Sequence, residues 1–383
     1  MEPLRVGFDA KRLVRNATGL GNYSRTLVSD LSALPEASLD LRLYAPDEGR
    51  DDLRRSVPEG PRVHYAYPPG HPSALGKALW RSRGVVRQLL SDGVQVFHGL
   101  SGELPLGLRQ SGIKSVVTIH DLIFLRHPEY YHPWDRAIYT WKFRQTLRQA
   151  DRIIAISLQT RRDIAQLGGV DEAAIDVVYQ SCHPRFSSVL APHRLASVRE
   201  RLSLPQHFFL SVGSIEERKN LMLAVEALPH LPGFLHLVAV GKATPYADKM
   251  LRRAQGLGVA SRVHLLHGVA DDDLQALYQM AEVFVYPSRY EGFGIPIIEA
   301  IHCRLPVVAA TGSCLEEAGG PDCLYVSPDA PDALADAIVR LRPGAADREE
   351  RIRRSLLYVQ RFQGRSVAAQ VADIYRQLGD KKS

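Results

Sequence analysis

The sequence predicts an α/β protein made of two doubly wound domains, each with a parallel sheet covered by helices on both faces. Short apolar runs of strand length alternate with helical patterns along the chain, and this alternation implies right-handed crossovers between parallel strands. With 383 residues, the chain exceeds the size at which one core keeps growing. A loop-like stretch, SCHPRFSSVLAPHR, divides the runs into two series. We therefore expect two domains of ordinary size.

The apolar runs predict the strands in chain order. In the first series we expect strands at residues 4–8, 41–44, 63–67, 94–97, 115–119, 152–156 and 175–179. In the second series we expect them at residues 208–212, 235–240, 263–266, 283–286, 307–309 and 324–326. The predicted domains span residues 1–187 and 193–362, followed by a helical segment within 363–383. Ligands of such sheets sit beyond the carboxyl ends of the strands, so we expect a shared ligand in the cleft between the domains.

The composition is that of an ordinary globular protein, with 45% hydrophobic and 23% charged residues. The four cysteines form no C-x-x-C pair and show no metal-ligand spacing with histidine, so reduced thiols are the simplest account. The N-terminus lacks the pattern of a signal peptide, and no run of about 18 apolar residues is present. We expect a cytoplasmic protein without a transmembrane segment.

The stretch PSRYEGFGIPIIEA carries the strongest chemical signal. It follows the apolar run VFVY and predicts a strand, a glycine-bearing turn and a helix that begins at Pro296. The N–H groups and the positive dipole end at such a helix start can seat phosphate oxygens, while Gly292 and Gly294 let the backbone approach a ligand. Glu291 and Glu299 flank the seat and can accept hydrogen bonds from hydroxyls. A nucleotide-sugar is the obvious ligand for this arrangement.

The spacing of Glu291 and Glu299 in this stretch resembles the signature of retaining glycosyltransferases of family 4. Further stretches follow the order of that family: VGFDAKRLVRNATGLGNYSRTLVSDL, TIHDLIFLRHPEYY, ADRIIAISLQTRRDI, VGSIEERKNLMLAV, VHLLHGVADDDLQALYQMAEVFVYPS and LPVVAATGSCLEEAGG. The resemblance implies the GT-B fold, with two facing Rossmann-like domains and the active site in the interdomain cleft. It implies that the first domain, 1–187, binds the acceptor, that the second, 193–362, binds the nucleotide-sugar, and that a C-terminal helix within 363–383 crosses back to the first domain. It also implies retaining transfer from a nucleotide-diphosphate sugar without a metal or other cofactor.

The stretches FDAKRLVRNATGLGNYSRTL and HDLIFLRHPEYY look most like the branch with GDP-mannose-dependent mannosyltransferases of bacterial polysaccharide assembly. GDP-mannose is therefore the favoured donor, with a UDP-sugar as the alternative, and the acceptor is expected to be a glycan or a polyprenol-diphosphate-linked glycan. A non-catalytic nucleotide-sugar-binding regulator and a GT-B nucleotide-sugar epimerase stay open as other functions. The regulator would bind donor without turnover, and the epimerase would need a different acid/base set.

Arg218 and Lys219 stand just before a predicted helix start. Two adjacent cations at a positive dipole end would stabilise the charge that develops on a diphosphate leaving group. Many relatives carry arginine one residue after the glycine of this turn, where this chain has Ser214, so we expect Arg218 to take over that role. The alternative is a solvated basic turn without a ligand.

Other site residues are expected at the carboxyl ends of strands. His120 and Asp121 follow the strand at 115–119, and the resemblance implies an active-site pair with the histidine contacting the donor sugar; Asp121 could instead cap a turn. Gly19 and Gly21 form a glycine-rich turn that contacts a ligand or simply shapes a helix start. We expect Glu291 to accept from sugar hydroxyls and Glu299 from the ribose. The remaining donor contacts are assigned to Gly268, Val269, Gly292, Phe293, Gly294 and Ile295, with the backbone of Gly268 and Val269 nearest the nucleobase.

Two charged stretches need separate interpretation. Asp271, Asp272 and Asp273 are read as an N-cap and acidic first turn of a helix rather than a metal site. The basic stretch at 75–90, with Lys77, Arg81, Arg83 and Arg87, fits either a peripheral helix on an anionic membrane surface or an ordinary surface helix. The formal net charge of +6 accompanies no recognised nucleic-acid module, so no nucleic-acid partner is expected.

Overall fold

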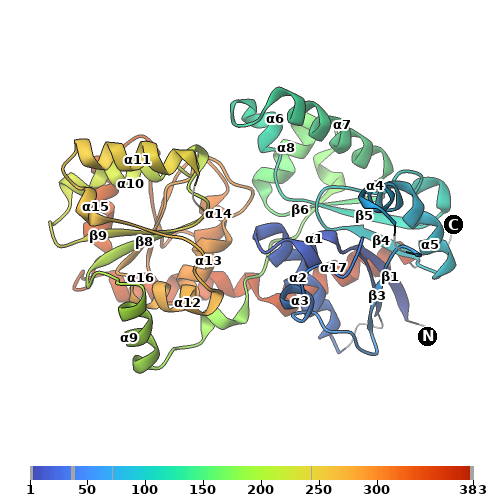
Figure 1. Cartoon of the computed structure of the whole chain (residues 1–383), viewed down its shortest axis with the longest axis horizontal. Coiled ribbons are helices and arrows are strands. Elements are labelled where there is room, and N and C mark those ends of the chain that lie inside the picture. Colours follow the sequence, from blue (N-terminus) through green and yellow to red (C-terminus); the bar gives the residue numbers. More distant parts are fainter. Residues whose placement is uncertain (1–2, 36–38, 71, 243, 380–383) are drawn as a thin grey trace. The chain divides into compact units, whose positions relative to one another are not determined.

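The computed structural model describes residues 3–35, 39–70, 72–242 and 244–379. The chain divides into two compact units, Met1–Ser181 with Phe362–Ser383, and Cys182–Arg361. Each unit is built on a parallel sheet with helices on both faces (Figure 1), which confirms the predicted fold class. We expected the first domain to run to residue 187, whereas the 3-10 turn Pro184–Ser187 belongs to the second unit. The reason is Phe186, whose buried ring meets Tyr278 of that unit edge to face.

The first unit contains a seven-stranded sheet in the order β3-β2-β1-β4-β5-β6-β7. Neighbouring strands are parallel throughout. The order reverses between β1 and β4, and ligands of doubly wound sheets bind beyond the carboxyl ends of the strands at such a switch point. The strands are β1 (Leu4–Asp9), β2 (Leu39–Tyr44), β3 (Val63–Ala66), β4 (Val96–Gly99), β5 (Lys114–Ile119), β6 (Arg152–Ala155) and β7 (Ile175–Val177).

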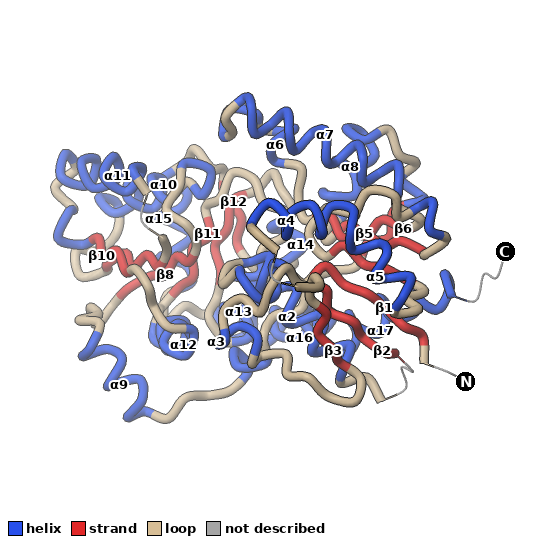
Figure 2. Tube along the Cα trace, turned by 45° about the vertical axis from the view of Figure 1, so that its right-hand side comes forward, coloured by secondary structure: helices blue, strands red, loops and turns tan. Residues whose placement is uncertain are grey.

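The helices of the first unit cover both faces of this sheet (Figures 1 and 2). A helix with an unusual middle runs from residue 74 to 91, because α4 and α5 are joined by a π-helical turn, Trp80–Gly84. Such wide turns are rare and are often found at functional sites. The helices are α1 (Lys11–Arg15), α2 (Gly19–Ser32), α3 (Asp51–Arg54), α4 (Ala74–Leu79), α5 (Val85–Ser91), α6 (Ile123–Arg126), α7 (Pro133–Gln149), α8 (Leu158–Gly168) and α17 (Gly364–Gly379).

The last helix, α17, packs against α2 and the sheet of the first unit, as the red helix among blue elements in Figure 1 shows. Its residues Val371 and Tyr375 are fully buried in the same core as Phe8. The Tyr375 hydroxyl also lies 2.6 Å from Nδ1 of His98 on β4. The C-terminal helix thus forms part of the first unit although it follows the second in sequence; residues 380–383 of the segment lie outside the described residues.

The second unit contains a six-stranded sheet in the order β10-β9-β8-β11-β12-β13, with parallel neighbours. Helices α10 and α11 lie on one face and α12 and α13 on the other (Figure 2). Its strands are β8 (Phe208–Val212), β9 (His236–Val240), β10 (Val263–Leu266), β11 (Val283–Tyr286), β12 (Val307–Ala310) and β13 (Leu324–Val326). Its helices are α9 (Pro192–Arg201), α10 (Leu221–Ala227), α11 (Pro245–Gly256), α12 (Asp271–Met280), α13 (Ile295–His302), α14 (Leu315–Gly319), α15 (Pro331–Leu341) and α16 (Arg348–Val359).

Every strand predicted from an apolar run is present, with each end within two residues of its expected place. The prediction succeeds because strands covered on both faces carry continuous apolar runs. No helix among the described residues combines the length and the hydropathy needed to cross a bilayer.

Candidate active site

The switch point of the second sheet lies between β8 and β11, and the loops that follow these two strands carry the strongest predicted site residues. The loop after β8 ends in a 3-10 turn, Glu217–Lys219, and Asn220 then adopts a left-handed conformation with φ +53° before α10 begins. The Asn220 side chain ties this loop to the one after β11 by donating to the Pro287 carbonyl at 3.2 Å. The fold therefore brings the two loops together beyond the carboxyl edge of the sheet.

Lys219 and Glu291 meet at this edge. The Lys219 ammonium lies 2.6 Å from Oε1 of Glu291 and donates to the Tyr286 hydroxyl at 2.8 Å. Burial is the largest single effect and lowers the pKa of Lys219, but the charge of Glu291, together with Tyr286 and the hydrogen bond to Glu291, brings the pKa above its ordinary value. Burial would likewise raise the pKa of Glu291, and the charges of Lys219 and Arg218 instead hold it at about 2. Both groups are therefore ionised at neutral pH.

Arg218 completes this cluster. Its guanidinium lies 3.0 Å from Oε2 of Glu291 and 2.7 Å from Oε1 of Glu216, and it donates to the Tyr290 carbonyl at 2.7 Å. The sequence pattern predicted two cations facing a ligand and Glu291 facing hydroxyls. It did not predict that Glu291 binds both cations, nor that Glu216 shares Arg218, because loops after different strands meet only in the folded sheet.

Residues of α14 and the residue just before it pack against the turn after β11. The buried Sγ of Cys314 lies 3.1 Å from the Glu291 carbonyl oxygen and 3.0 Å from that of Phe293, so its single S–H proton is shared between them or donated to one of them. Gly294 has a φ of +138°, and a Cβ there would lie 3.2 Å from the side chains of Ala318 and Leu315, so only glycine suits this position. Nothing in the spacing of the cysteines pointed to the role of Cys314 as a support for this turn.

Helix α13 begins at Ile295, one residue earlier than predicted, with Pro296 in its first turn. Proline lacks an N–H, and the Ile297 N–H donates to the Gly294 carbonyl at 3.0 Å. The Ile295 N–H stands at the positive end of the helix dipole, where no earlier helical carbonyl can accept it. The phosphate-binding site predicted at this helix start therefore offers fewer free N–H groups than a helix start usually does.

Glu299 lies one turn into α13, where Oε2 accepts from the Tyr278 hydroxyl at 2.9 Å. Burial raises the pKa of Glu299 to about 7, although the Tyr278 bond opposes that rise. The two motif carboxylates therefore differ in charge behaviour: the cations keep Glu291 ionised, whereas Glu299 titrates near neutral pH. The pattern of two glutamates seven residues apart did not distinguish them.

Gly268 and Val269 lie in the loop after β10, which is the edge strand of the sheet. Gly268 is exposed with φ +66°, and Val269 is half-buried. Strand β9 stands between β10 and β8, so this loop is the more distant of the predicted donor contacts from Lys219. Its role against a nucleobase stays a prediction.

The acidic triplet forms the first turn of α12, but the N-cap is Ala270 rather than an aspartate, which corrects our expectation of an aspartate cap. Asp273 instead accepts from Arg194 at 2.8 Å and from Arg201 at 2.7 Å, both on α9. These ion pairs fasten α9 to α12 within the second unit.

In the first unit, His120 follows β5 with both ring nitrogens in hydrogen-bond range of protein groups. Nε2 lies 2.8 Å from the Leu100 carbonyl, and Nδ1 lies 2.9 Å from the side-chain nitrogen of Gln180. These partners define a neutral ring with the proton on Nε2, and burial lowers the pKa of His120 to about 4. Gln180 carried no sequence signal. Asp121 accepts from the Ile123 N–H at 3.2 Å, so the capping role considered for it is present in the structure.

The glycine-rich turn is the first turn of α2, which begins at Gly19. The short helix α1 separates this turn from β1, so the turn does not directly follow the strand as we expected. A Cβ at Gly21 would lie 1.7 Å from the Asn16 carbonyl oxygen, whereas a Cβ at Gly19 would meet nothing within 4 Å. Close packing therefore requires glycine at Gly21 and not at Gly19.

Comparison with known proteins supplies the family. Residues 18–184 match the family model described as Glycosyltransferase Family 4, and residues 196–354 match the model described as Glycosyl transferases group 1. The O-antigen chain mannosyltransferase B of Escherichia coli is 27% identical over 398 residues, covering 98% of this chain and 100% of that protein. The serotype-specific mannosyltransferase WbdA of Escherichia coli is 29% identical over 251 residues, which cover 62% of this chain but 31% of that longer protein.

Two solved structures share the fold along nearly the whole chain. Sucrose-phosphate synthase from Thermosynechococcus elongatus aligns with a TM-score of 0.77 at 23% identity, covering 98% of this chain and 99% of that one. The HepE protein of Anabaena in complex with UDP and glucose aligns with a TM-score of 0.73 at 17% identity, covering 98% of this chain and 100% of that one.

The two parallel sheets and the family matches together define the class of protein: it is a glycosyltransferase of the GT-B fold. The chain belongs to the family-4 glycosyltransferases, and within them it is similar to the branch of bacterial O-antigen mannosyltransferases.

Proposed function

We propose that this glycosyltransferase binds a nucleotide-diphosphate sugar at the switch point of its second sheet and transfers the hexose with retention of configuration. The observation that carries the proposal is the cluster of Arg218, Lys219 and Glu291 beside the start of α13. Two cations and a helix dipole in one place stabilise the charge that develops on a departing diphosphate.

The charge balance of the cluster sets how strongly it attracts phosphate. Arg218 and Lys219 both form ion pairs with Glu291, whereas Glu216 forms an ion pair with Arg218. A phosphate oxygen therefore competes with the Glu291 carboxylate for the Lys219 ammonium. As Lys219 turns toward the diphosphate, Glu291 becomes available to accept from sugar hydroxyls, so one ion pair links donor binding to sugar positioning.

The names of the relatives support a choice of donor. The similar Escherichia coli proteins are named mannosyltransferases, which favours GDP-mannose, while the HepE structure holds UDP and glucose and keeps a UDP-sugar as the alternative. We assign Glu299 to the ribose and the Ile295 N–H to a phosphate oxygen, without a metal or other cofactor. We propose a glycan or a polyprenol-diphosphate-linked glycan as the acceptor.

The first test is a binding and turnover panel of GDP-, UDP- and ADP-sugars. A donor that binds only the folded protein raises its melting temperature in proportion to occupancy. GDP-mannose should give the largest shift and should be consumed when a mannan-type acceptor is added. A shift with no transfer to any acceptor would point to a binding protein, and conversion of the donor to its epimer without acceptor would point to an epimerase.

We also propose peripheral contact with an anionic membrane at the cytoplasmic face. Only two of the four basic residues of the stretch at 75–90, Arg83 and Arg87, are assigned to this contact. Arg81 pairs with Asp9 and Glu103, and Lys77 pairs with Asp47, so these two cations are not available to a lipid surface. Arg83 and Arg87 are exposed and together could contribute about 2 kcal/mol of attachment. The Arg83→Glu/Arg87→Glu variant should sediment less with anionic liposomes at low salt than the wild type; equal sedimentation would contradict membrane contact through this helix.

A further inference from the structure

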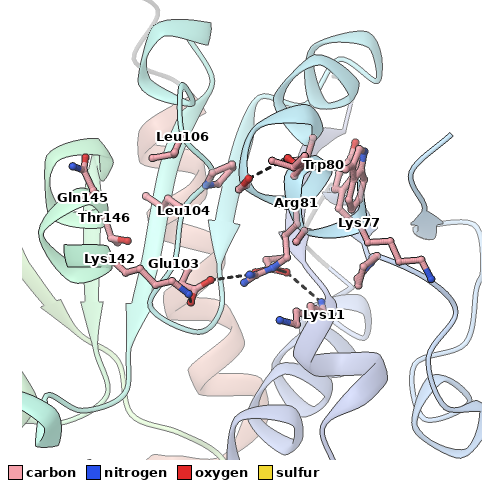
Figure 3. A pocket seen from close by; sticks show the side chains of 18 of the residues that line it. Lys11, Lys77, Trp80, Arg81, Glu103, Leu104, Leu106, Lys142, Gln145 and Thr146 are labelled. Atoms are coloured by element: carbon pink, nitrogen blue, oxygen red, sulfur yellow. Dashed lines mark hydrogen bonds and ion pairs between the residues drawn. The ribbon is translucent and has the colours of Figure 1, made fainter. Parts of the chain in front are cut away.

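The carboxyl edge of the first sheet carries two groups of polar side chains. One group lines a cavity of about 590 Å³, where Arg81 forms ion pairs with Asp9 and Glu103 (Figure 3). His120 is not among the residues that line this cavity. It is the centre of the second group, to which four other segments of the first unit contribute.

Three of these segments hold the backbone, the ring edge and one ring nitrogen of His120. The Thr160 hydroxyl, on α8, donates to the His120 carbonyl at 3.3 Å. The Tyr23 ring, on α2, meets the imidazole edge to face with 4.6 Å between the ring centres. Nε2 lies 2.8 Å from the Leu100 carbonyl oxygen, which belongs to the loop after β4. Because a carbonyl oxygen only accepts, Nε2 carries a proton.

The Tyr23 ring is itself fixed by a buried chain of hydrogen bonds. Its hydroxyl lies 2.9 Å from Oγ1 of Thr118, and the same oxygen lies 2.8 Å from Nε2 of His98. Nδ1 of His98 lies 2.6 Å from the hydroxyl of Tyr375 on the last helix. Buried polar networks whose members are satisfied make their surroundings rigid, so the surface against which His120 packs is rigid as well.

The fourth partner, Gln180, binds the other ring nitrogen through a side chain. Its side-chain nitrogen lies 2.9 Å from Nδ1 of His120. An amide N–H donates, so Nδ1 accepts and carries no proton. Gln180 is only 8% exposed and lies after β7, next to Ser181, the last residue of this part of the unit. The Ser181 hydroxyl donates to Oδ2 of Asp30 at 3.1 Å, which anchors the segment that carries Gln180.

The opposite arrangement, with the amide oxygen of Gln180 toward Nδ1, would require a second proton on the ring. Burial lowers the pKa of His120 to about 4, and the charge of Arg12 acts in the same direction. Two other titratable groups lie close to the ring, and both are neutral: burial lowers the pKa of His98 to about 3 and raises that of Tyr23. No charge among these groups favours an imidazolium, so the ring keeps a single proton.

We propose that Gln180 is a positioning residue for the transfer reaction: its amide keeps Nδ1 of His120 free of a proton, so that a hydroxyl of the transferred sugar can donate to Nδ1 in place of the amide. Nε2 is bonded to the backbone, whereas a side-chain amide can withdraw when a substrate hydroxyl arrives. An acceptor that is oriented before the substrate binds needs no reorganisation during the reaction. In assigning the hydroxyl to the transferred sugar, the inference rests on the proposed function; the position of the ring proton does not.

The first measurement observes the ring directly, by ¹⁵N nuclear magnetic resonance of protein labelled at its histidines. The signals of His120 are identified by their loss in the His120→Asn variant. At neutral pH the wild type should show an unprotonated Nδ1 and a protonated Nε2. A proton on Nδ1, with or without one on Nε2, would overturn the inference.

Two substitutions of similar size separate positioning from packing. Gln180→Met keeps the bulk but offers no N–H, so the rate of sugar transfer should fall about tenfold. Gln180→Glu places a carboxylate beside Nδ1 and draws a proton onto it, so His120 should show imidazolium signals at neutral pH. Transfer should then fall further, about a hundredfold. A purely structural glutamine predicts the reverse order, because glutamate is the closer match in shape, and that order would overturn the inference.

Free GDP lacks the transferred sugar, so its affinity should be unchanged in both Gln180 variants, and a matched loss of GDP affinity would contradict a role at the sugar. Gln275→Met supplies the control, because Gln275 is also buried and its amide donates to the Ser188 carbonyl of the second unit at 2.7 Å. This variant should leave the His120 signals unchanged, and melting curves check that every variant is folded.

The measurements also separate this inference from the proposed function. Equal transfer by the wild type and both Gln180 variants would overturn this inference alone. The expected ring proton in a protein that turns over no nucleotide-sugar would overturn the proposed function, and with it the assignment of the hydroxyl, but not the role of Gln180 in placing the proton.

Discussion

The Lys219 ammonium lies 2.6 Å from the Glu291 carboxylate although the two residues stand 72 positions apart in the chain. Strands β8 and β11 are neighbours in the sheet, so the loops that follow them share one edge. With Arg218 added, this pair forms a buried group of ionised side chains. Burial of charged groups is unfavourable unless well-placed partners compensate for the lost hydration. We therefore direct the first predictions at this cluster.

Replacing Lys219 by alanine should lower turnover at saturating donor, because one preorganised charge contact to the leaving group is lost. The loss of transition-state stabilisation should be about 2–4 kcal/mol. Arg218 still pairs with Glu291, so the fold should persist, as a melting curve would show. Lys249→Ala, which removes an exposed lysine of the same unit, serves as the control and should retain full activity. Near-normal turnover of Lys219→Ala would remove this residue from the mechanism.

Replacing Glu291 by glutamine should separate affinity from transfer. The variant loses the negative charge that competes with phosphate for Lys219 and Arg218, so free GDP should bind several-fold more tightly. Sugar transfer should fall, because an acceptor of sugar hydroxyls is weakened. Calorimetry with GDP and a transfer assay with GDP-mannose measure the two effects; weaker GDP binding would contradict the proposed competition.

Glu299→Gln should weaken the donor and free nucleoside diphosphate alike, if the carboxylate holds the ribose. The contact should also depend on pH, because burial raises the pKa of Glu299 to about 7 and only the ionised form accepts from both ribose hydroxyls. In the wild type, donor affinity should therefore rise between pH 6 and 8. The Glu299→Gln variant should lack this rise, and unchanged affinity of the variant for both ligands at pH 8 would sink the assignment.

The same group should make stability depend on pH. A carboxyl group with a pKa raised from 4.5 to about 7 on folding binds its proton more tightly in the folded protein than in the unfolded chain. Its contribution to the free energy of unfolding therefore falls as pH rises from about 4.5 to about 7, by at most about 3 kcal/mol. Glu299→Gln should gain stability relative to wild type at pH 8 but not at pH 4.5. The control Glu349→Gln, at an exposed position, should show no such difference in urea denaturation.

The two glycines at the start of α2 should respond oppositely to alanine. Gly21→Ala places a Cβ against the Asn16 carbonyl and should destabilise the protein by about 1–3 kcal/mol. Gly19→Ala meets open space and should be neutral or slightly stabilising, since alanine restricts the unfolded chain. Thermal melting of both variants decides the matter; equal losses would mean that the helix start is less tightly packed than the structure shows.

The sequence by itself determined the strands, the parallel sheets and the family. Strands buried on both faces must be apolar along their length, so runs such as those at 208–212 and 283–286 reveal them without any long-range information. The residues of the glycosyltransferase signature are also local, because a strand, a turn and a helix start follow one another within the stretch PSRYEGFGIPIIEA.

Only the tertiary structure decided which charges meet. Strand order, not sequence order, places Glu291 beside Lys219 and gives Arg81 both Asp9 and Glu103. The structure also shows that the four cations of the stretch at 75–90 differ: Lys77 and Arg81 form ion pairs, whereas Arg83 and Arg87 are exposed. A local pattern records which face of a helix is polar, but the partner of a charge comes from another element, and its pKa depends on that partner and on burial.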